Sequence, residues 1–549
     1  MRISIATFFA LSISFAPLSA QVSTGGLPYG LRQGLPVQEL PAVRSAAFDA
    51  AAVALEDAAR EAEGKIPTYG RILAVNAGLH NAGLWTSLPN GDRVWRLRVV
   101  SEGALATELY YADLHIPNNA SLYVYSEDGE TVLGGFTAYN NTEDGLFTTS
   151  LVPGDASILE YYEPAEVMGE GSLTITGVGH AYRFVDEVSR AAGACEVDVN
   201  CSEGANWQAQ RDAVVRMSIV QGGFSYWCSG ALVNNLDQDC KPYFLSAQHC
   251  DEGSTQAELN QWKFYFNYER SGCGTGTAPS NRTVTGFYRR GASNDGGGDS
   301  GSDFLLVEAK NAIPSSYNPY WAGWDATGVG STGGVGIHHP DGDRKKISTY
   351  TMTTASSSWN GPAGTHWRVQ WAATANGHGV TEGGSSGSPL FNSSKRIIGT
   401  LTGGSSYCSA PNGYDYYGKM SYHWQSNPEP ATMRLKNFLD PQNTGTKTMD
   451  GSYFPCSPVG VGEAAQAPER LALYPNPADA TVTINVPQHA RNSVLEVFDM
   501  GGRLIHGSTL TGAEQHVLNT TELENGAYLV RMSVQGRVIA SAPLIVAHP

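Results

Sequence analysis

Three short stretches of the chain carry residues that could act together in nucleophilic catalysis. FLSAQHC places His249 before Cys250, GSDFLLVE contains Asp303, and GSSGSPL contains Ser386. A serine hydroxyl is a poor nucleophile alone, so it needs a base such as His249 and a buried carboxylate such as Asp303 that holds the base in the correct tautomer. The order His, Asp, Ser therefore predicts acyl transfer with Ser386 as the nucleophile.

Small residues around the serine suit the tight turn that exposes a nucleophile. The run GSSGSP, which begins at Gly384, would aim the backbone N–H groups of Gly384 and Ser386 at one point, as an oxyanion hole requires. FLSAQHC is typical of an apolar strand that ends at His249. A disulfide between Cys228 and Cys250 would fix the loop that carries this histidine.

Composition limits the class of protein. The 549 residues are too many for one core, and the 63 glycines with only 16% charged residues favour β-sandwiches and barrels with many turns. The net charge of −17 argues against nucleic acid or an anionic membrane as the main partner.

The first twenty residues are typical of a secretory signal. Arg2 precedes an apolar run, and Leu18-Ser19-Ala20 is a small-residue cleavage site, so we expect cleavage after Ala20. No later stretch is long enough to span a membrane. Export favours disulfides for the eight cysteines, and without a CxxC pair of zinc spacing we expect no metal and no other cofactor.

The segment before the catalytic motifs has its own pattern. Residues 41–64 predict a helix that ends at Gly64 and buries one face, and residues 68–185 predict an antiparallel sandwich of short alternating strands. The residues of the helical face are Phe48, Ala52, Leu55 and Ala59. We interpret residues 21–190 as a pro-domain that is removed after it assists folding; the alternative is a permanent binding module.

The remainder divides into three parts. Residues 191–458 contain all eight cysteines and the three catalytic candidates, with a late helix expected in ATMRLKNFLDP before Pro441. Residues 459–470 are a linker, and residues 471–549 predict a small β-sandwich from strands at regular spacing.

The last part resembles the C-terminal sorting domain of the Bacteroidetes type IX secretion system. The resemblance is carried by Tyr474-Pro475-Asn476-Pro477, Asp499-Met500-Gly501-Gly502-Arg503 and Gly526-Ala527-Tyr528-Leu529-Val530. It implies export across the outer membrane with the type IX machinery as a partner, followed by removal of this domain or its exchange for a surface anchor.

From about Gly193 to Gly451 the chain resembles the lysyl endopeptidases, a bacterial branch of the chymotrypsin-like serine proteases. The matching fragments occur in order: CEVDVNC, CSGALVNN, YFLSAQHC, SDFLLVE, YWAGWD, GIHHPDGD, VTEGGSSGSP and LDPQNTGTKTMDG. The resemblance implies a mainly β chain with a double β-barrel, in which His249, Asp303 and Ser386 form the triad.

The resemblance also implies a disulfide framework. Its pairs are Cys195–Cys408, Cys201–Cys273 and Cys228–Cys250. Cys240 and Cys456 remain, and we predict that they pair and tie the tail of the domain to the first barrel; the alternative is two free thiols.

Substrate preference in this family depends on an acid, which maps onto Asp415 in GYDYYGK, and on a pocket tryptophan, which maps onto Trp359. A buried carboxylate recovers its desolvation cost by pairing with a cation, and an indole ring face attracts one. Lysine-specific members carry a histidine where this chain has Thr402 in LTGG; Thr402 and Gly403 complete the candidate substrate site.

The expected pro–mature junction bears on the same question. Arg190 precedes Ala191, so self-processing would require cleavage after arginine. The first hypothesis is therefore a secreted, monomeric serine endopeptidase that cleaves proteins and peptides after Arg or Lys, with strict lysine specificity as the alternative. The non-enzymatic hypothesis is a surface adhesin or pseudoprotease.

The position before the nucleophile is also informative. Animal proteases of this type place an aspartate there, which receives the new N-terminal ammonium after activation, whereas this chain has Ser385. We therefore expect a substrate pocket that does not depend on insertion of the N-terminus.

Overall fold

The computed structural model describes residues 23, 25–37, 39–183, 185, 192–428, 430–456, 469–486, 492–499, 504–511, 515–521, 523–534 and 537–548. The predicted processing positions Ala20 and Arg190, most of the linker and part of the motif at 499–503 lie outside these residues. Contacts divide the chain into two units, residues 1–457 and 458–549. None of the helices in the described ranges has the length and apolar character needed to cross a bilayer.

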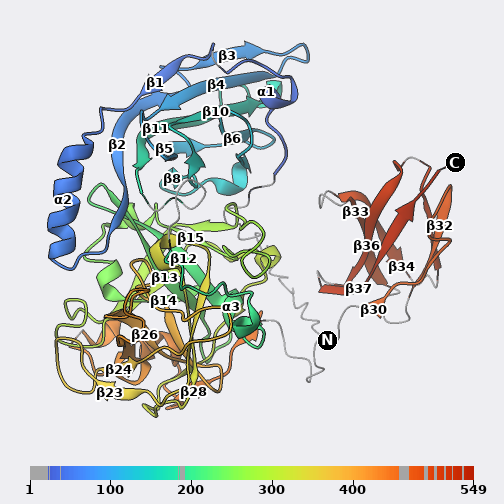
Figure 1. Cartoon of the computed structure of the whole chain (residues 1–549). Helices are drawn as coiled ribbons and strands as arrows, with labels where there is room; N and C mark the ends of the chain where they lie inside the picture. Colours follow the sequence, from blue (N-terminus) through green and yellow to red (C-terminus); the bar gives the residue numbers. More distant parts are fainter. Residues whose placement is uncertain are drawn as a thin grey trace, which may run out of the picture. The chain divides into compact units, whose positions relative to one another are not determined.

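The N-terminal part of the first unit is a sandwich of two sheets (Figure 1). One sheet contains β1 (Ala42–Arg44), β3 (Leu84–Ser87), β4 (Arg93–Val100), β6 (Ser121–Ser126), β7 (Val132–Phe136) and β10 (Ala156–Glu163). The other contains β2 (Thr68–Gly78), β5 (Ala106–His115), β8 (Phe147–Thr148), β9 (Val152–Pro153) and β11 (Ser172–Ala181). Trp95, Tyr111 and Leu159 are among the fully buried side chains between them. The antiparallel sandwich predicted for residues 68–185 is present.

The helix predicted for residues 41–64 is shorter than expected. Residues 42–44 form β1, whose backbone pairs with β4, and helix α2 (Ala50–Ala62) begins only after Asp49, whose side chain caps the N–H groups of Ala51 and Ala52. The predicted apolar face is also wrong. Leu55 is 76% exposed, whereas Asp57 is buried because Arg71, Thr68 and Tyr182 bind its carboxylate.

The part that contains the catalytic candidates has two groups of strands, each around a hydrophobic core of its own, and a third core contains residues of both groups. The first group comprises β12 (Val214–Gln221), β13 (Phe224–Val233), β14 (Tyr243–Ser246), β15 (Lys263–Tyr265), β16 (Thr283–Thr285), β17 (Phe287–Ala292) and β18 (Leu305–Ala309). Its strand order is β16-β15-β12-β13-β14-β18-β17.

The second group has the order β22-β21-β25-β26-β27-β24-β23. Its strands are β21 (Gly334–His338), β22 (Lys346–Tyr350), β23 (Ala355–Ser357), β24 (His366–Val369), β25 (Pro389–Asn392), β26 (Ile397–Gly404) and β27 (Asp415–Lys419), with β20 (Trp324–Asp325) and β28 (Thr448–Met449) beside β26. Together the two groups form the double barrel expected for a chymotrypsin-like fold.

Short elements connect these strands. They are α3 (Gln208–Ala213), α4 (Gln256–Leu259), α5 (Met420–His423), α6 (Lys436–Leu439), β19 (Tyr320–Trp321) and β29 (Ser452–Tyr453), whereas α1 (Tyr29–Arg32) precedes the first strand of the N-terminal sandwich. The late helix expected in ATMRLKNFLDP is represented by a 3₁₀ turn, Ala431–Met433, and the single turn α6.

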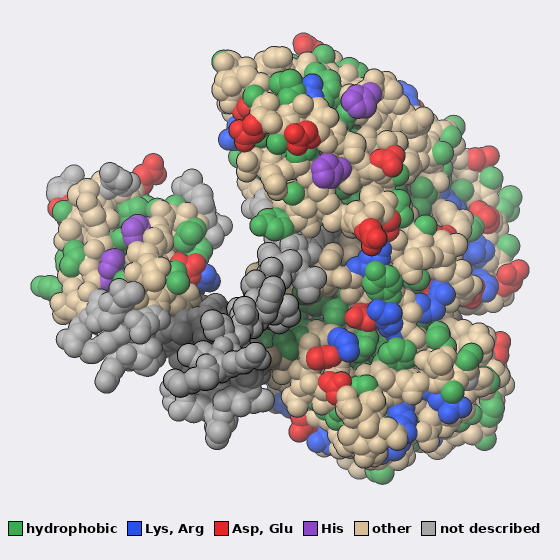
Figure 2. Space-filling view, turned by 180° about the vertical axis from the view of Figure 1, so that it is seen from behind, with side chains coloured by type: hydrophobic (Ala, Val, Ile, Leu, Met, Phe, Trp, Pro, Cys, Tyr) green, Lys and Arg blue, Asp and Glu red, His purple; other side chains and the backbone are tan. Residues whose placement is uncertain are grey.

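One strand pairing joins the sandwich to the first barrel. β2 pairs antiparallel with β13, with Thr68 opposite Tyr226 and Arg71 opposite Phe224. The two domains that the sequence treats as separate therefore share one continuous sheet (Figure 1). On the face shown in Figure 2, Lys and Arg side chains are interspersed with Asp and Glu and form no single basic surface.

The second unit is a small β-sandwich, as predicted. Its strands are β30 (Glu469–Arg470), β31 (Leu473–Tyr474), β32 (Thr481–Asn485), β33 (Asn492–Asp499), β34 (Leu504–Thr511), β35 (Gln515–Asn519), β36 (Gly526–Val534) and β37 (Arg537–Val546). They form one five-stranded and one three-stranded sheet around a core that includes Val482, Val497 and Val530.

Candidate active site

The predicted base and acid lie together at the end of the first barrel. His249 follows β14 in a 3₁₀ turn, and its ring Nδ1 lies 2.7 Å from Oδ2 of Asp303. The backbone N–H of His249 donates to Oδ1 of the same carboxylate at 2.9 Å. Burial acts to lower the pKa of His249, but the Asp303 charge and hydrogen bond outweigh it and raise that pKa above its usual value.

Asp303 is completely buried and is held by several groups. Its backbone has a positive φ of 60° just before β18, and its N–H donates to Oδ2 of Asp295 at 2.7 Å. Burial acts to raise the pKa of Asp303, but the charge of His249 and hydrogen bonds, including one from Thr402, lower it below its usual value. The carboxylate is therefore the charged partner that an imidazole base requires.

Thr402 connects this acid to a second histidine. Its hydroxyl lies 3.0 Å from Nε2 of His366, and it also supplies the hydrogen bond to Asp303. The hydroxyl thus faces the acid and His366, and the methyl group lies toward Gly298, where a Cβ would come within 3.4 Å of it. This support from the residue that replaces the family histidine was not recognised in the sequence.

The predicted nucleophile lies in the expected turn. Gly384 and Gly387 have positive φ values of 80° and 78°, and the carbonyl of Ser386 accepts a hydrogen bond from the N–H of Ser229 at 2.8 Å. A Cβ on Gly387 would collide with Oγ of Ser246 and lie 2.6 Å from the carbonyl of Ser229. Glycine is required there because the turn is pressed against β13 and β14.

Two backbone N–H groups beside the serine are the candidates for an oxyanion hole. The carbonyl of Gly383 accepts a hydrogen bond from the N–H of Asp341 at 2.5 Å. Because C=O and N–H point in opposite directions across a trans peptide, this bond turns the N–H of Gly384 away from Asp341. Among the described residues, neither the N–H of Gly384 nor that of Ser386 has a hydrogen-bond partner, so both can bind a developing oxyanion.

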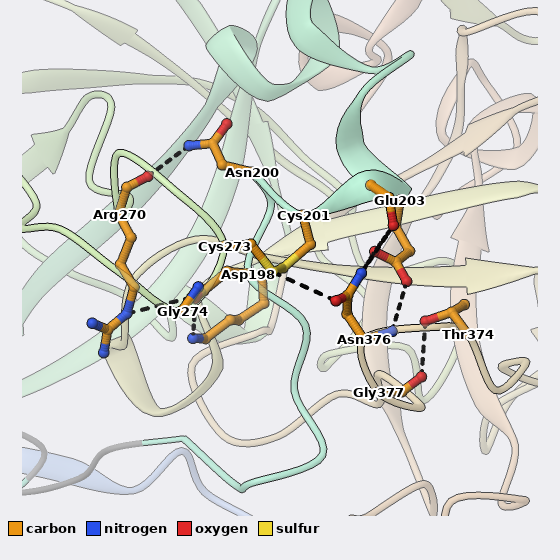
Figure 3. The surroundings of a disulfide bond; sticks show 12 residues. Asp198, Asn200, Cys201, Glu203, Arg270, Cys273, Gly274, Thr374, Asn376 and Gly377 are labelled. Carbon is orange, nitrogen blue, oxygen red and sulfur yellow. Dashed lines mark hydrogen bonds and ion pairs between the residues drawn. A yellow bond between two sulfur atoms is a disulfide. The ribbon is translucent and has the colours of Figure 1, made fainter.

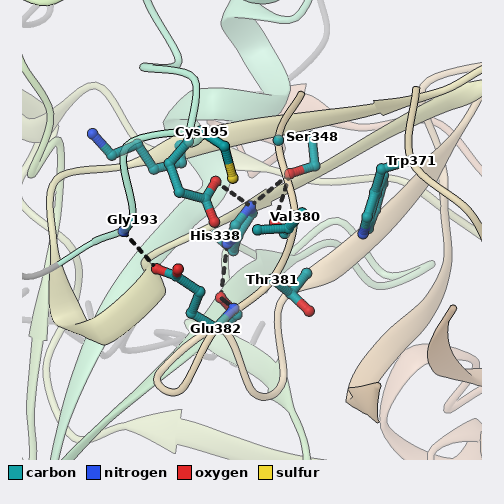
Figure 4. Close-up of polar contacts among 12 residues, drawn as sticks. Gly193, Cys195, His338, Ser348, Trp371, Val380, Thr381 and Glu382 are labelled. Carbon is teal, nitrogen blue, oxygen red and sulfur yellow. Dashed lines mark hydrogen bonds and ion pairs between the residues drawn. The ribbon is translucent and has the colours of Figure 1, made fainter. Parts of the chain in front are cut away.

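A buried histidine supports the same turn (Figure 4). His338 Nδ1 lies 2.8 Å from Oγ of Ser385, and its Nε2 lies 3.0 Å from Oγ of Ser348. Burial lowers the pKa of His338 to about 3, so the ring is neutral at working pH. His338 was given no role in the sequence analysis, although it stands in the quoted fragment GIHHPDGD.

The candidate specificity acid is fully buried and is bound by neutral donors. Oδ2 of Asp415 accepts from Ser406 Oγ at 2.6 Å, Trp371 Nε1 at 2.6 Å and Thr381 Oγ1 at 2.8 Å. Oδ1 accepts only a longer bond, 3.2 Å, from the N–H of Ser406. Burial raises the pKa of Asp415 despite these bonds, and a cation beside Oδ1 would favour the charged form.

Two glycines and an indole surround this acid. A Cβ on Gly404 would collide with Oδ1 of Asp415, so the close packing of β26 on this carboxylate requires glycine at position 404. A Cβ on Gly403 would lie 3.0 Å from the ring of Trp359, which in turn packs edge-on against Tyr416. The predicted residues Asp415, Trp359 and Gly403 are thus brought together at the ends of β26 and β27.

All four predicted disulfides are formed. Cys228–Cys250 links β13 to the turn that carries His249, and Cys240–Cys456 joins the tail of the domain to the first barrel. Cys195–Cys408 ties the start of the catalytic part to the second barrel. Cys201–Cys273 lies in a polar network in which Asp198 binds both Gly274 and Arg270 (Figure 3).

Comparison with known proteins agrees with this arrangement. Residues 189–418 match the family model for the C-terminal domain of lysyl endopeptidase, and residues 472–546 match that for the secretion system C-terminal sorting domain. A lysyl endopeptidase of Pseudomonas aeruginosa is 28% identical over 390 residues, which cover 65% of this chain and 80% of that protein.

Solved structures with similar parts are serine proteases. The thermostable serine protease AL20 from an extremophilic microorganism has a TM-score of 0.29 at 13% identity, over 38% of this chain and 92% of its own. The protease Anisep from Arthrobacter nicotinovorans has a TM-score of 0.28 at 18% identity, over 38% and 90%. The match to the lysyl endopeptidase domain supports a serine endopeptidase, and the sorting domain indicates export by type IX secretion.

Proposed function

We propose that this secreted serine endopeptidase cleaves proteins and peptides after arginine or lysine. The observation that carries the proposal is Asp415, a buried carboxylate whose Oδ2 is bound by three neutral donors, whereas its Oδ1, beside Gly404, accepts only one longer bond among the described residues. A cationic side chain offers that oxygen a charged partner, whereas an apolar or acidic side chain would leave it without one.

The proposed cycle uses the residues described above. Ser386 attacks the backbone carbonyl carbon of the basic residue, and His249 accepts the proton of the serine hydroxyl while Asp303 stabilises the resulting imidazolium. The oxyanion binds the N–H groups of Gly384 and Ser386. His249 then protonates the leaving amine, and water repeats the sequence on the acyl-enzyme.

Strict lysine specificity is the second candidate, because the Pseudomonas aeruginosa relative is a lysyl endopeptidase. The replacement of the family histidine by Thr402 favours the broader preference, because threonine is smaller than histidine and its hydroxyl is bound to His366 and Asp303. Acceptance of arginine would also allow self-processing at Arg190, with residues 21–190 as the removed pro-domain. We propose a monomer as the mature form.

Matched peptides that differ only at the cleavage residue test this proposal. The mature enzyme should cleave peptides with Arg and with Lys and leave those with Leu or Glu intact. Cleavage after Lys alone would establish the strict specificity. Cleavage after Leu or Glu at a comparable rate would remove Asp415 as the specificity acid.

A further inference from the structure

The segment that connects α2 to the N-terminal sandwich lies against the catalytic site at three points. Lys65 Nζ binds both carboxylate oxygens of Glu252, at 2.5 and 2.6 Å. A Cβ on Gly383 would lie 3.4 Å from Cγ of Pro67. Beyond this point the segment continues as β2 and pairs with the edge of β13, beginning with Thr68 opposite Tyr226.

Each of these contact points adjoins a catalytic group. Glu252 comes three residues after His249, and Gly383 directly precedes Gly384 of the oxyanion turn. Tyr226 lies on β13 three residues before Ser229, whose N–H donates a hydrogen bond to the carbonyl of Ser386. The connecting segment therefore passes directly beside the reacting groups.

The described polar contacts of the same segment do not include the candidate specificity residues. Among the described residues, no hydrogen bond or ion pair joins the N-terminal domain to Trp359, Thr402 or Asp415. A substrate places the residue before the scissile bond in that pocket, so the residues after the bond must leave on the opposite side of Ser386. The connecting segment and the edge of β13 are the candidates for that side, since the segment contacts Glu252, Gly383 and β13 rather than the pocket residues.

Chain direction agrees with this placement. β2 runs antiparallel to β13, from Thr68 beside the catalytic turn to Arg71, away from it. The leaving part of a substrate would also run outward from Ser386, and an extended peptide binds an exposed strand edge through backbone hydrogen bonds. Residues 65–71 thus have the chain direction, and through β2 the strand pairing, expected of the substrate residues that follow the scissile bond.

We propose that the edge of β13 at Phe224–Tyr226, with Glu252 and Gly383, binds the leaving side of substrates, and that residues 65–71 occupy this surface in the unprocessed chain. Glu252 makes the surface selective for a basic residue after the scissile bond. The inference rests on the proposed endopeptidase function.

Buried contacts hold the segment in place. Lys263 of β15 and Glu108 of β5 form an ion pair at 2.6 Å with both side chains fully buried, and Lys263 also donates to the carbonyl of Thr149. Tyr69, next to Thr68, hydrogen-bonds Ser218 and stacks on Trp227 with ring centroids 4.2 Å apart. Because these contacts do not involve the junction at Arg190, cleavage there alone leaves the surface occupied.

The test compares two substrates of the full chain carrying Arg190→Gln, which keeps the N-terminal domain attached. One is a peptidyl-arginine methyl ester, and the other is the same peptide extended by four residues after arginine. The reference, called the processed enzyme below, is mature protein from which the cleaved residues 21–190 have been removed. We expect the unprocessed chain to hydrolyse the ester within about 3-fold of the processed enzyme and to cleave the extended peptide at least about 100-fold more slowly, because the competent state is rarely populated.

The outcomes separate the inference from the proposed function. If the unprocessed chain cleaves the extended peptide as fast as the processed enzyme, the inference is overturned while the endopeptidase function stands. If a fluorophosphonate fails to label Ser386 and the processed enzyme cleaves neither substrate, the proposed function itself fails.

A charge reversal tests the assignment of Glu252. In the Arg190→Gln chain, Lys65→Glu should speed cleavage of the extended peptide by about 2- to 5-fold, the range of an exposed ion pair. The matched control is Lys395→Glu, at an exposed lysine in the turn between β25 and β26, which should leave the rate of peptide cleavage unchanged.

In the processed enzyme, Glu252→Gln should lower kcat/KM for peptides with lysine after the scissile bond by a similar factor and leave ester hydrolysis unaltered. Equal effects on peptide and ester would overturn the assignment.

Discussion

The hydroxyl of Ser385 shares a hydrogen bond of 2.8 Å with Nδ1 of the buried His338, beside the proposed nucleophile Ser386. The same hydroxyl oxygen accepts the N–H of Glu382 at 3.2 Å. Two neutral partners therefore hold the position at which animal proteases form an ion pair with a new N-terminus. The turn is stabilised without an ammonium group.

This arrangement predicts that activity is insensitive to the N-terminus of the processed enzyme. Adding one or two residues before Ala191 should change kcat/KM by less than about 2-fold, because no ion pair is lost. Active-site titration with a fluorophosphonate, combined with peptide assays, measures this effect. An extended enzyme that folded but remained inactive would contradict the prediction.

The triad assignment predicts a graded loss of turnover. Ser386→Ala or His249→Ala should lower kcat by about 10⁶-fold, and Asp303→Asn by about 10⁴-fold, because the base loses its tautomer and its charge partner. Single-turnover assays measure the loss, on variants that size-exclusion chromatography shows to be folded. Asp303→Asn with nearly full activity would show that His249 is oriented by another group.

The raised pKa of His249 predicts the acid limb of the pH profile. The base must be neutral to accept the serine proton. We therefore expect kcat/KM to be low at acid pH and to rise with pH around an apparent pKa above about 6.5, the usual value for histidine. Removal of the Asp303 charge should move this limb to lower pH.

Asp341 provides the control for this assignment, since burial and the neighbouring Glu382 raise its pKa to about 7. Asp341→Asn, at a backbone position with positive φ where asparagine is tolerated, should leave the position of the limb unchanged. A limb that moved with Asp341 and not with Asp303 would exclude His249 as its source.

The pocket assignment predicts a change of specificity without loss of the catalytic machinery. Asp415→Asn should abolish the preference for Arg and Lys while labelling by a fluorophosphonate persists, because the triad and oxyanion turn are untouched. Asp237→Asn, on an exposed loop, is the matched control. If Asp415→Asn still cleaved only after basic residues, another group would carry the specificity.

Local chemistry explains why the candidate site residues could be chosen from the sequence; their catalytic roles stay predictions. A strand followed by histidine, an aspartate at the start of an apolar strand, and a glycine-rich turn around serine each require particular residues at fixed spacing, and these are visible in the chain as written. The four cysteine pairs were also correct because they accompany the family motifs. The N-terminal helix was predicted less well. Residues 42–44 pair with β4 as a strand instead of joining the helix, and the helix buries Asp57, which pairs with Arg71, rather than the predicted apolar face.

The sequence alone determined the mainly β architecture, the order of the domains and the candidate catalytic residues, since these follow from periodicity and from motifs that are local in the chain. Only the tertiary structure decided the supports of the site: Thr402 beneath Asp303, His338 behind Ser385, and β2 paired with β13. These contacts join residues far apart in sequence, and their geometry depends on how separate strands meet. No local pattern encodes that, because a strand edge, a buried histidine and a threonine look the same in sequence whatever they contact.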